Sequence, residues 1–292
     1  RTGDDEDEDE DMEDVDEENL LTTIVECVGQ LLKCYQTAFI PALEMHLLGL
    51  LQLLLTPDRS PSDRTAALCV IDDIIEHCSA DGGSATYIQQ AAPMLHQYAA
   101  DPAADVRQAA AYGLGVLAEH GGGHYAAVQA AQAAEVLLRV ITDPTARADD
   151  NETATDNAVS ALGKLLLHRP TSIQSEQVLG IWLSYLPVRG DKVEAAVVHA
   201  QLCSLAEQHG VALLQNGQQA GAVVNALARV AISPDLAGAE TRERAVRNLL
   251  ALRSEASAEH ALVQLQGALT DAERQQLQAA LASGAAAAQQ QQ

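Results

Sequence analysis

The sequence predicts an all-α fold, an α-α superhelix of about six stacked helix pairs. Of its 292 residues 48% are hydrophobic but only 3% are aromatic, so Ala, Leu and Val must supply the core. This composition favours helix over sheet. Apolar residues recur with the period of amphipathic helices, and no run shows the two-residue alternation of a strand. The helical segments come in pairs that repeat at roughly 35–50 residues.

The clearest repeat covers residues 87–123. A first apolar segment follows Ala91, and a polar break at Asp101-Pro102 separates it from a second segment. Small or apolar residues in the second segment stand at 106, 109, 110, 113, 114 and 117, which is the stripe of an amphipathic helix. Pro102 suits a helix start, and the run Gly121-Gly122-Gly123 should end the helix. We expect Gly113 to permit close helix packing, since no strand or Gly-Lys-Ser/Thr accompanies these glycines as in a phosphate loop.

The same pattern predicts the remaining elements in chain order. Leu20 to Tyr35 should be the second helix of a repeat whose first helix is missing. Trp182 falls in an apolar stripe, so we expect it in the core rather than at a ligand. The predicted solenoid spans 19–283, with repeats 19–36 (partial), 37–80, 87–123, 128–169, 174–210 and 211–253 and capping helices over 257–283.

The two ends differ from this array. Residues 1–18 contain thirteen acids and one base, and we expect them to be disordered, because they cannot bury apolar surface. Residues 284–292 are an Ala/Gln low-complexity tail, also expected to be frayed or disordered. The first residue is Arg1 rather than Met, from which we expect a fragment or a processed product. We see no signal peptide and no apolar run long enough for membrane insertion.

The net charge of −24 excludes some partners and favours others. A chain this acidic should repel nucleic acid and anionic membranes and should attract basic proteins. The five cysteines are odd in number and form no CxxC, so we expect reduced, small core residues in a cytosolic or nuclear protein. Neither His77-Cys78 nor the pair His120 and His124 has zinc spacing, so we expect no metal and no cofactor. No hydrolase, metalloprotease or kinase signature occurs, so we expect no enzymatic activity.

Several segments also resemble a known family. The repeat spacing matches HEAT and armadillo solenoids, and the HEAT pattern is present where Pro93 lies in the first helix and Asp101 closes it. The strings Cys69–Ser79, Val106–Ala118, Asn157–Lys164 and Val178–Leu186 are similar to the C-terminal part of importin-beta (karyopherin-beta) family receptors. Within that family they look most like the importin-5 (karyopherin beta-3) branch. The resemblance covers roughly residues 14–280 and weakens after 210.

The resemblance implies a nuclear transport receptor that shuttles between cytoplasm and nucleus. Such receptors bind basic cargo proteins, cross the pore through contacts with nuclear pore proteins, and release cargo when the Ran GTPase binds in its GTP form. This chain has far fewer repeats than the family, and it lacks the N-terminal repeats that carry much of the Ran contact. We therefore expect this piece to perform part of the function.

Two groups of acids are candidates for contacts with basic partners. The dense run near the N-terminus could attract lysine- and arginine-rich segments, or could serve as a solvating spacer. A second group lies on the polar side of the helix in repeat 37–80 and could instead be an ordinary hydrated face or pair with a neighbouring repeat. The candidates are Asp4, Asp5, Glu6, Asp7, Glu8, Asp9, Glu10, Asp11, Glu13, Asp14, Asp72, Asp73 and Glu76.

Two arginines have a structural interpretation. In HEAT arrays an acid and an arginine at equivalent positions link neighbouring repeats, and Arg64 and Arg107 occupy matching places in consecutive copies. The alternative to transport is a static HEAT scaffold, such as a regulatory subunit that holds a complex together. A scaffold would hold its partners regardless of the nucleotide on Ran.

Overall fold

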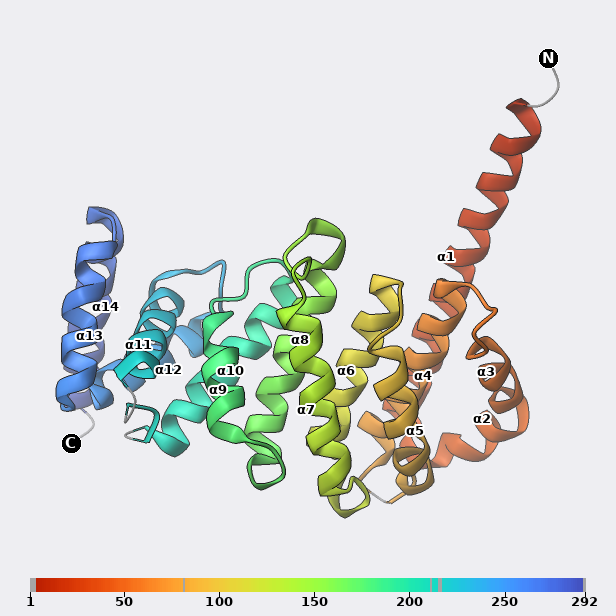
Figure 1. Cartoon of the computed structure of the whole chain (residues 1–292), viewed down its shortest axis with the longest axis horizontal. Helices are drawn as coiled ribbons and strands as arrows, with labels where there is room; N and C mark the ends of the chain where they lie inside the picture. Colours follow the sequence, from red (N-terminus) through yellow and green to blue (C-terminus); the bar gives the residue numbers. More distant parts are fainter. Residues whose placement is uncertain (1–3, 81, 211, 215–216, 291–292) are drawn as a thin grey trace. The chain divides into compact units, whose positions relative to one another are not determined.

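The computed structural model describes residues 4–80, 82–210, 212–214 and 217–290, and gives residues 4–18, 217–218 and 290 through their backbone alone. Throughout these ranges every regular element is a helix and no strand occurs, which confirms the predicted all-α class. The helices form two compact units, residues 1–143 and 144–292, shown in Figure 1. Each unit has its own core.

The first unit is built around α4, which packs against both α1 and α6. Leu32, Leu43, Ile74 and Ile75 are fully buried there, because the apolar stripe of each helix faces its neighbours. The elements are α1 (Asp4–Tyr35), the 3₁₀ turn η1 (Gln36–Phe39), α2 (Ile40–His46), α3 (Leu48–Leu54), α4 (Pro61–Cys78), α5 (Ala85–Tyr98), α6 (Ala104–His120), η2 (Gly122–His124) and α7 (Ala127–Thr142).

The second unit continues the alternation of first and second helices. Trp182 is completely buried, and its indole Nε1–H donates to the carbonyl of Val159 at 2.8 Å, which confirms its predicted place in the core. The elements are α8 (Asp149–His168), η3 (Pro170–Ser172), α9 (Ser175–Ser184), α10 (Lys192–His209), η4 (Ala212–Leu214), α11 (Gly217–Ile232), α12 (Ala239–Leu252), α13 (Ala256–Ala268) and α14 (Asp271–Gln290).

Local signals set several helix ends. The Ser60 hydroxyl accepts from the backbone N–H of Asp63 at 3.1 Å, and Pro61 occupies the first turn of α4. The Asp191 carboxylate caps α10 by accepting from the backbone N–H groups of Val193 and Glu194. At the other end of a helix, α6 stops at His120, and the following Gly122 has φ of +51°, which a side chain would disfavour.

Within each unit, first helices of successive repeats pack against one another, and so do second helices. In the first unit, α4 contacts α1 and α6, while α5 contacts α7. In the second, α10 contacts α8 and α12, α12 contacts α14, and α11 contacts α9 and α13. This nearest-neighbour stacking is what a repeat array needs, because a single helix pair cannot bury its apolar faces.

The structure differs from the sequence prediction at both ends of the chain. Residues 4–18 are helical rather than disordered, as the start of α1, and residues 284–290 are helical as the end of α14. Helix propagation adds a hydrogen bond for each residue it orders. Acids near a helix N-terminus interact favourably with its dipole, and alanine has the highest helix propensity. Residues 1–3 and 291–292 lie outside the described residues.

The first helix of repeat 37–80 is also broken, since α2 and α3 meet at a bend at Leu47. The break lets Leu43 and Leu51 both reach the core of the first unit. Among the described residues no single helix could span a membrane. One bent pair, Asn19–His46 with Leu48–Leu54, has the length and composition only across a 70° break.

Candidate partner-binding surface

The acidic run lies at the start of α1, and Figure 1 shows it extending beyond the helices that pack on the rest of α1. From residue 19 onward, where the side chains of α1 are described, the first buried ones are Val28 and Leu32. The candidates from Asp4 to Asp14 therefore share one helical extension. The contacts of their side chains lie outside the described residues, so their role in partner binding stays a prediction.

The second group of acids does not form the exposed face that its helical spacing suggests. Asp72 of α4 is 1% exposed, and its carboxylate lies against Gly113 of α6. A Cβ added at Gly113 would overlap Asp72 Oδ1 and would come within 2.8 Å of Leu95 Cδ2. Gly113 thus permits close helix packing as predicted, and Asp72 is too buried to meet a partner.

Asp73 and Glu76 also face neighbouring helices. The Tyr112 hydroxyl of α6 donates to Glu76 Oε2 at 2.8 Å. Asp73 lies beside Gly29 of α1, where an added Cβ would be 2.5 Å from Asp73 Oδ2, and burial raises the pKa of the Asp73 carboxyl. Of the two alternatives to cargo binding, these contacts fit pairing with neighbouring repeats.

Arg64 links two successive helix pairs of the first unit. One guanidinium nitrogen is 3.2 Å from Asp101 Oδ1, and the two side chains are only 8% and 10% exposed. A second nitrogen donates to the carbonyl of Arg59. Arg107 instead donates to the carbonyls of Asp101 and Pro102, each at 2.7 Å, in the turn that precedes its own helix. Both arginines therefore converge on the turn between α5 and α6.

Sequence reasoning missed a buried carboxylate in the second unit. Asp156 of α8 has a fully buried side chain and accepts from Arg147 at 3.3 Å and from the backbone N–H of Asp191 at 2.9 Å. Burial raises the pKa of Asp156, against the opposing effect of these partners. Glu194 of α10, also buried, has its pKa raised for the same first reason. Nothing in the apolar pattern marks Asp156, because its neighbours in α8 are small and polar.

Side-chain hydrogen bonds between helix pairs recur in the second unit, at the spacing of one repeat. Asp191 bonds to Asp156 across 35 residues, and Asn248 bonds to the carbonyl of Cys203 across 45. Between these limits are His199 with the carbonyl of Leu236 and the Gln201 amide with the carbonyl of Ser160. These bonds therefore link neighbouring helix pairs, at separations that lie within the predicted repeat spacing of roughly 35–50 residues.

The cysteines do not share one environment. Cys78 and Cys203 are buried as predicted, and Cys69 is half-buried. Cys27 and Cys34 are exposed on α1, so the prediction that all five are core residues is wrong for this pair. In the part of the chain that the structure describes, no three His, Cys, Asp or Glu side chains gather as metal ligands would.

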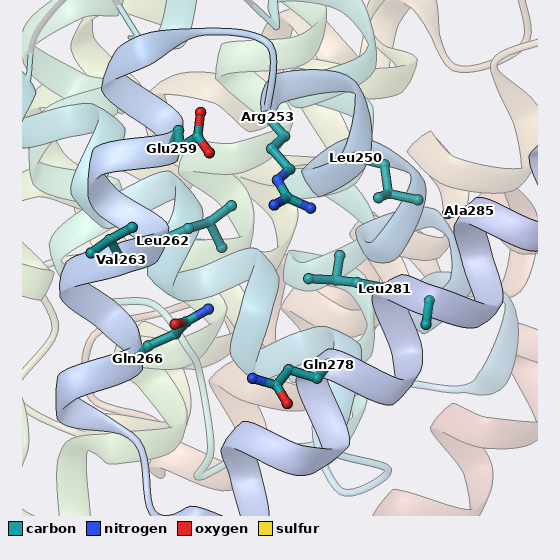
Figure 2. Close-up of a pocket in the computed structure, with 10 residues that line it drawn as sticks. Leu250, Arg253, Glu259, Leu262, Val263, Gln266, Gln278, Leu281 and Ala285 are labelled. Atoms are coloured by element: carbon teal, nitrogen blue, oxygen red, sulfur yellow. The ribbon is translucent and has the colours of Figure 1, made fainter.

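Figure 2 shows a groove of about 370 Å³ where the end of α12 meets α13 and α14. Its walls are largely aliphatic, with Leu262 from α13 and Leu281 from α14. Arg253, just past α12, points into this space, and Glu259 lies at its edge. The groove could hold an apolar side chain beside a polar group.

Comparison with known proteins identifies the class to which this architecture belongs. Karyopherin Kap121p bound to the SUMO protease Ulp1p matches 89% of this chain with a TM-score of 0.68 and 22% identity, over 23% of its own length. Kap121p bound to RanGTP matches 93% of this chain with a TM-score of 0.59 and 22% identity, again over 23% of its length. The stacked helix pairs are therefore HEAT repeats.

Sequence comparison finds similarity to importins. The family model described as Importin repeat 6 matches residues 1–57. A probable importin-5 homolog of Dictyostelium discoideum is 26% identical over 211 residues, covering 68% of this chain and 19% of the relative. Importin subunit beta-3 of Saccharomyces cerevisiae is 28% identical over 200 residues, covering 68% and 18%. The chain is therefore similar to importin-beta family proteins over about two thirds of its length, and it spans about a fifth of the length of these relatives.

Proposed function

We propose that this chain is part of a nuclear import receptor and that its acidic α1 extension binds lysine- and arginine-rich segments of cargo proteins. In the whole receptor, RanGTP and nuclear pore proteins would be further partners, and the receptor would move between cytoplasm and nucleus. The observation that carries the proposal is the similarity to importin-5 and importin beta-3 relatives over 68% of the chain. The structural relative Kap121p has been solved with RanGTP and with Nup53p, which supports these partner classes.

The distribution of charge supports cargo binding through the first unit. Residues 1–143 contain 26 acids and 6 bases, whereas residues 144–292 contain 15 acids and 11 bases. A helix that carries acids on every side has a negative potential in all directions around its axis. Such a surface attracts basic segments through many weak contacts, which weaken as salt is added.

The proposed mechanism is binding and release rather than catalysis. Adjacent repeats are joined mainly by their own interfaces, so a partner can shift the curvature of the array by small changes at several interfaces. Cargo and RanGTP would then favour different curvatures, and binding of one would weaken binding of the other.

The decisive experiment uses the complete receptor that contains this chain. The receptor is immobilised, loaded with nuclear and cytosolic proteins, and eluted with Ran carrying GTP or GDP. Elution of basic nuclear proteins by the GTP form alone is the expected result. Equal elution by both forms would overturn the transport proposal and would favour a static HEAT scaffold.

A second measurement assigns the role of the extension. The ten acids from Asp4 to Asp14 are changed to their amides, and binding of a labelled lysine-rich peptide is followed by fluorescence anisotropy. A matched control neutralises ten acids of the second unit, chosen from those other than the buried Asp156 and Glu194. We expect the first variant to lose most of its affinity and its salt dependence, and the control to lose little. Equal losses would show that net charge alone, and not α1, attracts the peptide.

A further inference from the structure

The second half of α14 packs on α12 without carrying any charge. From Gln275 onward α14 contains only Gln, Ala, Leu, Ser and Gly. The helices approach closely at Gly284, where an added Cβ would lie 2.5 Å from Val246 Cγ1 and 3.2 Å from Leu250 Cδ1. On both sides of this contact the alanines of α14 are too small to fill the space beside α12.

Two hollows result, on opposite faces of α14. The groove of Figure 2 involves residues 278, 281, 282 and 285 of α14, and a larger hollow of about 620 Å³ involves 280, 283, 284, 287 and 288. These two sets lie on opposite sides of an α-helix because of its 3.6-residue period. The larger hollow has an alanine-rich floor, and its other wall is α12 with Arg242 and Arg247.

Of these two arginines, Arg247 interacts electrostatically with Glu207 of α10, which is already paired with Arg244. Within the described residues neither makes an ion pair, and the Nε of Arg242 is buried with no hydrogen-bond partner. Arg244, between them, is engaged by Glu207 at 2.8 Å. The exposed Glu243 also lines the hollow, yet residues 239–253 hold four arginines and two glutamates in a chain of net charge −24. This segment is thus locally basic.

We propose that this hollow binds an acidic peptide segment that carries an apolar side chain, supplied by a partner protein. A carboxylate of the segment would be held by Arg242 and Arg247, because guanidinium groups bind carboxylates with directed, paired hydrogen bonds. The adjacent apolar side chain would cover the alanine floor. This partner is opposite in charge to the basic cargo proposed for α1, so the inference does not rest on that function.

The apolar floor argues for a peptide rather than a small anion. A free phosphate would satisfy the arginines but would leave the alanines beside it exposed to water, with most of the 620 Å³ unused. A segment that combines Glu or Asp with Leu or Phe would bury both kinds of surface at once. The pairing of a charged wall with an apolar floor is therefore the basis of the expected selectivity.

The test measures fluorescence anisotropy of labelled peptides mixed with the whole chain. One peptide alternates Glu with Leu, a second alternates Glu with Gly, and a third alternates Lys with Leu. We expect the Glu/Leu peptide to bind more tightly than the Glu/Gly peptide at the hollow. The double variant Arg242→Glu/Arg247→Glu should weaken the Glu/Leu peptide by about tenfold or more.

Two further variants distinguish peptide binding at the hollow from an effect of net charge and from misfolding. The control Lys192→Glu/Arg253→Glu changes the net charge equally, and Arg253 lies in the other groove, so it should leave the affinity nearly unchanged. Ala287→Leu keeps every charge and fills the hollow, and it should weaken binding while circular dichroism stays that of wild type. The proposal is overturned if the control reversal weakens the peptide as much as the double variant does. It is also overturned if inorganic phosphate at matched ionic strength displaces the peptide fully, or if Ala287→Leu has no effect.

Discussion

The carboxylate of Asp72 on α4 lies directly against Gly113 on α6, so an acid that sequence spacing places on the polar side of its helix is buried between two helices. The same relationship recurs at Gly163 of α8, which faces the side chain of Gln201 on α10. At both places a glycine on the second helix of one repeat gives room to a polar side chain on the second helix of an adjacent repeat. The spacing of the stacked helices therefore depends on these glycines having no side chain.

We predict that Gly113→Ala destabilises the first unit. The new methyl group would overlap Asp72 Oδ1 and crowd Leu95, and such overpacking costs about 1–3 kcal/mol. Thermal unfolding of the variant and the wild type measures the change. Gly267→Ala is the matched control, because nothing lies within 4 Å of a Cβ there and alanine is the better helix former. A Gly113→Ala protein as stable as the wild type would show that α4 and α6 can separate freely.

The ion pair of Arg64 with Asp101 should contribute far more than an exposed pair. Asp101→Asn leaves a guanidinium that is 8% exposed without its carboxylate, and loss of one partner in a buried pair costs about 3–5 kcal/mol. The same substitution at Asp271, which is 91% exposed and 3.2 Å from Arg274, should cost less than about 1 kcal/mol. Chemical denaturation compares the two variants, and similar costs would contradict the structural role of Arg64.

Asp156 should make the stability of the second unit depend on pH. Burial raises its folded-state pKa above 3.8, so the folded protein takes up this proton before the unfolded chain does. The wild type therefore gains stability as pH falls from the folded pKa towards 3.8, relative to Asp156→Asn, which cannot titrate there. Fluorescence of the buried Trp182 follows unfolding of this unit. Parallel stability curves for the two proteins, or a wild type that loses stability relative to Asp156→Asn as pH falls, would refute the prediction.

The cysteines should react in two groups. Cys27 and Cys34 are exposed on α1, whereas burial raises the pKa of Cys69 to about 12 and that of Cys203 to about 11. Because the thiolate is the reactive form, limited alkylation of the native chain should modify the first two well before the others. Mass spectrometry of tryptic peptides measures the order, with the denatured chain as the control in which all five react. Early labelling of Cys203 in the native chain would be inconsistent with its burial.

Helical periodicity was sufficient to predict the helices but not what covers them. In α4 the helical spacing of apolar residues includes Ile74 and Ile75, and both are buried. It says nothing about Asp72, because α4 lies between α1 and α6 and both of its sides are covered. The apolar stripe of a helix predicts which of its faces is buried. Whether another helix also covers its polar face depends on how the repeats stack.

The predictions for the cysteines of α1 and for the acidic run were wrong because they too depended on packing that the sequence pattern does not show. Cys27 and Cys34 are exposed because α1 packs against α4 on one side, a fact that residue-type preferences for burial do not contain. The acidic run was judged by its inability to form a core, although a helix needs no core of its own when it continues from a packed segment. Arg64 was selected from the HEAT pattern, and it forms an ion pair with Asp101 in the turn between α5 and α6.

The spacing of the side-chain hydrogen bonds also determines how the chain can reach its fold. The bonds between repeats described above join residues no more than 45 positions apart, so none requires distant parts of the chain to meet first. The entropy lost in closing each loop therefore stays small and nearly constant along the sequence. Ordered structure can start at whichever helix pair forms first and spread to its neighbours, so during synthesis the earlier repeats can fold before the later ones exist.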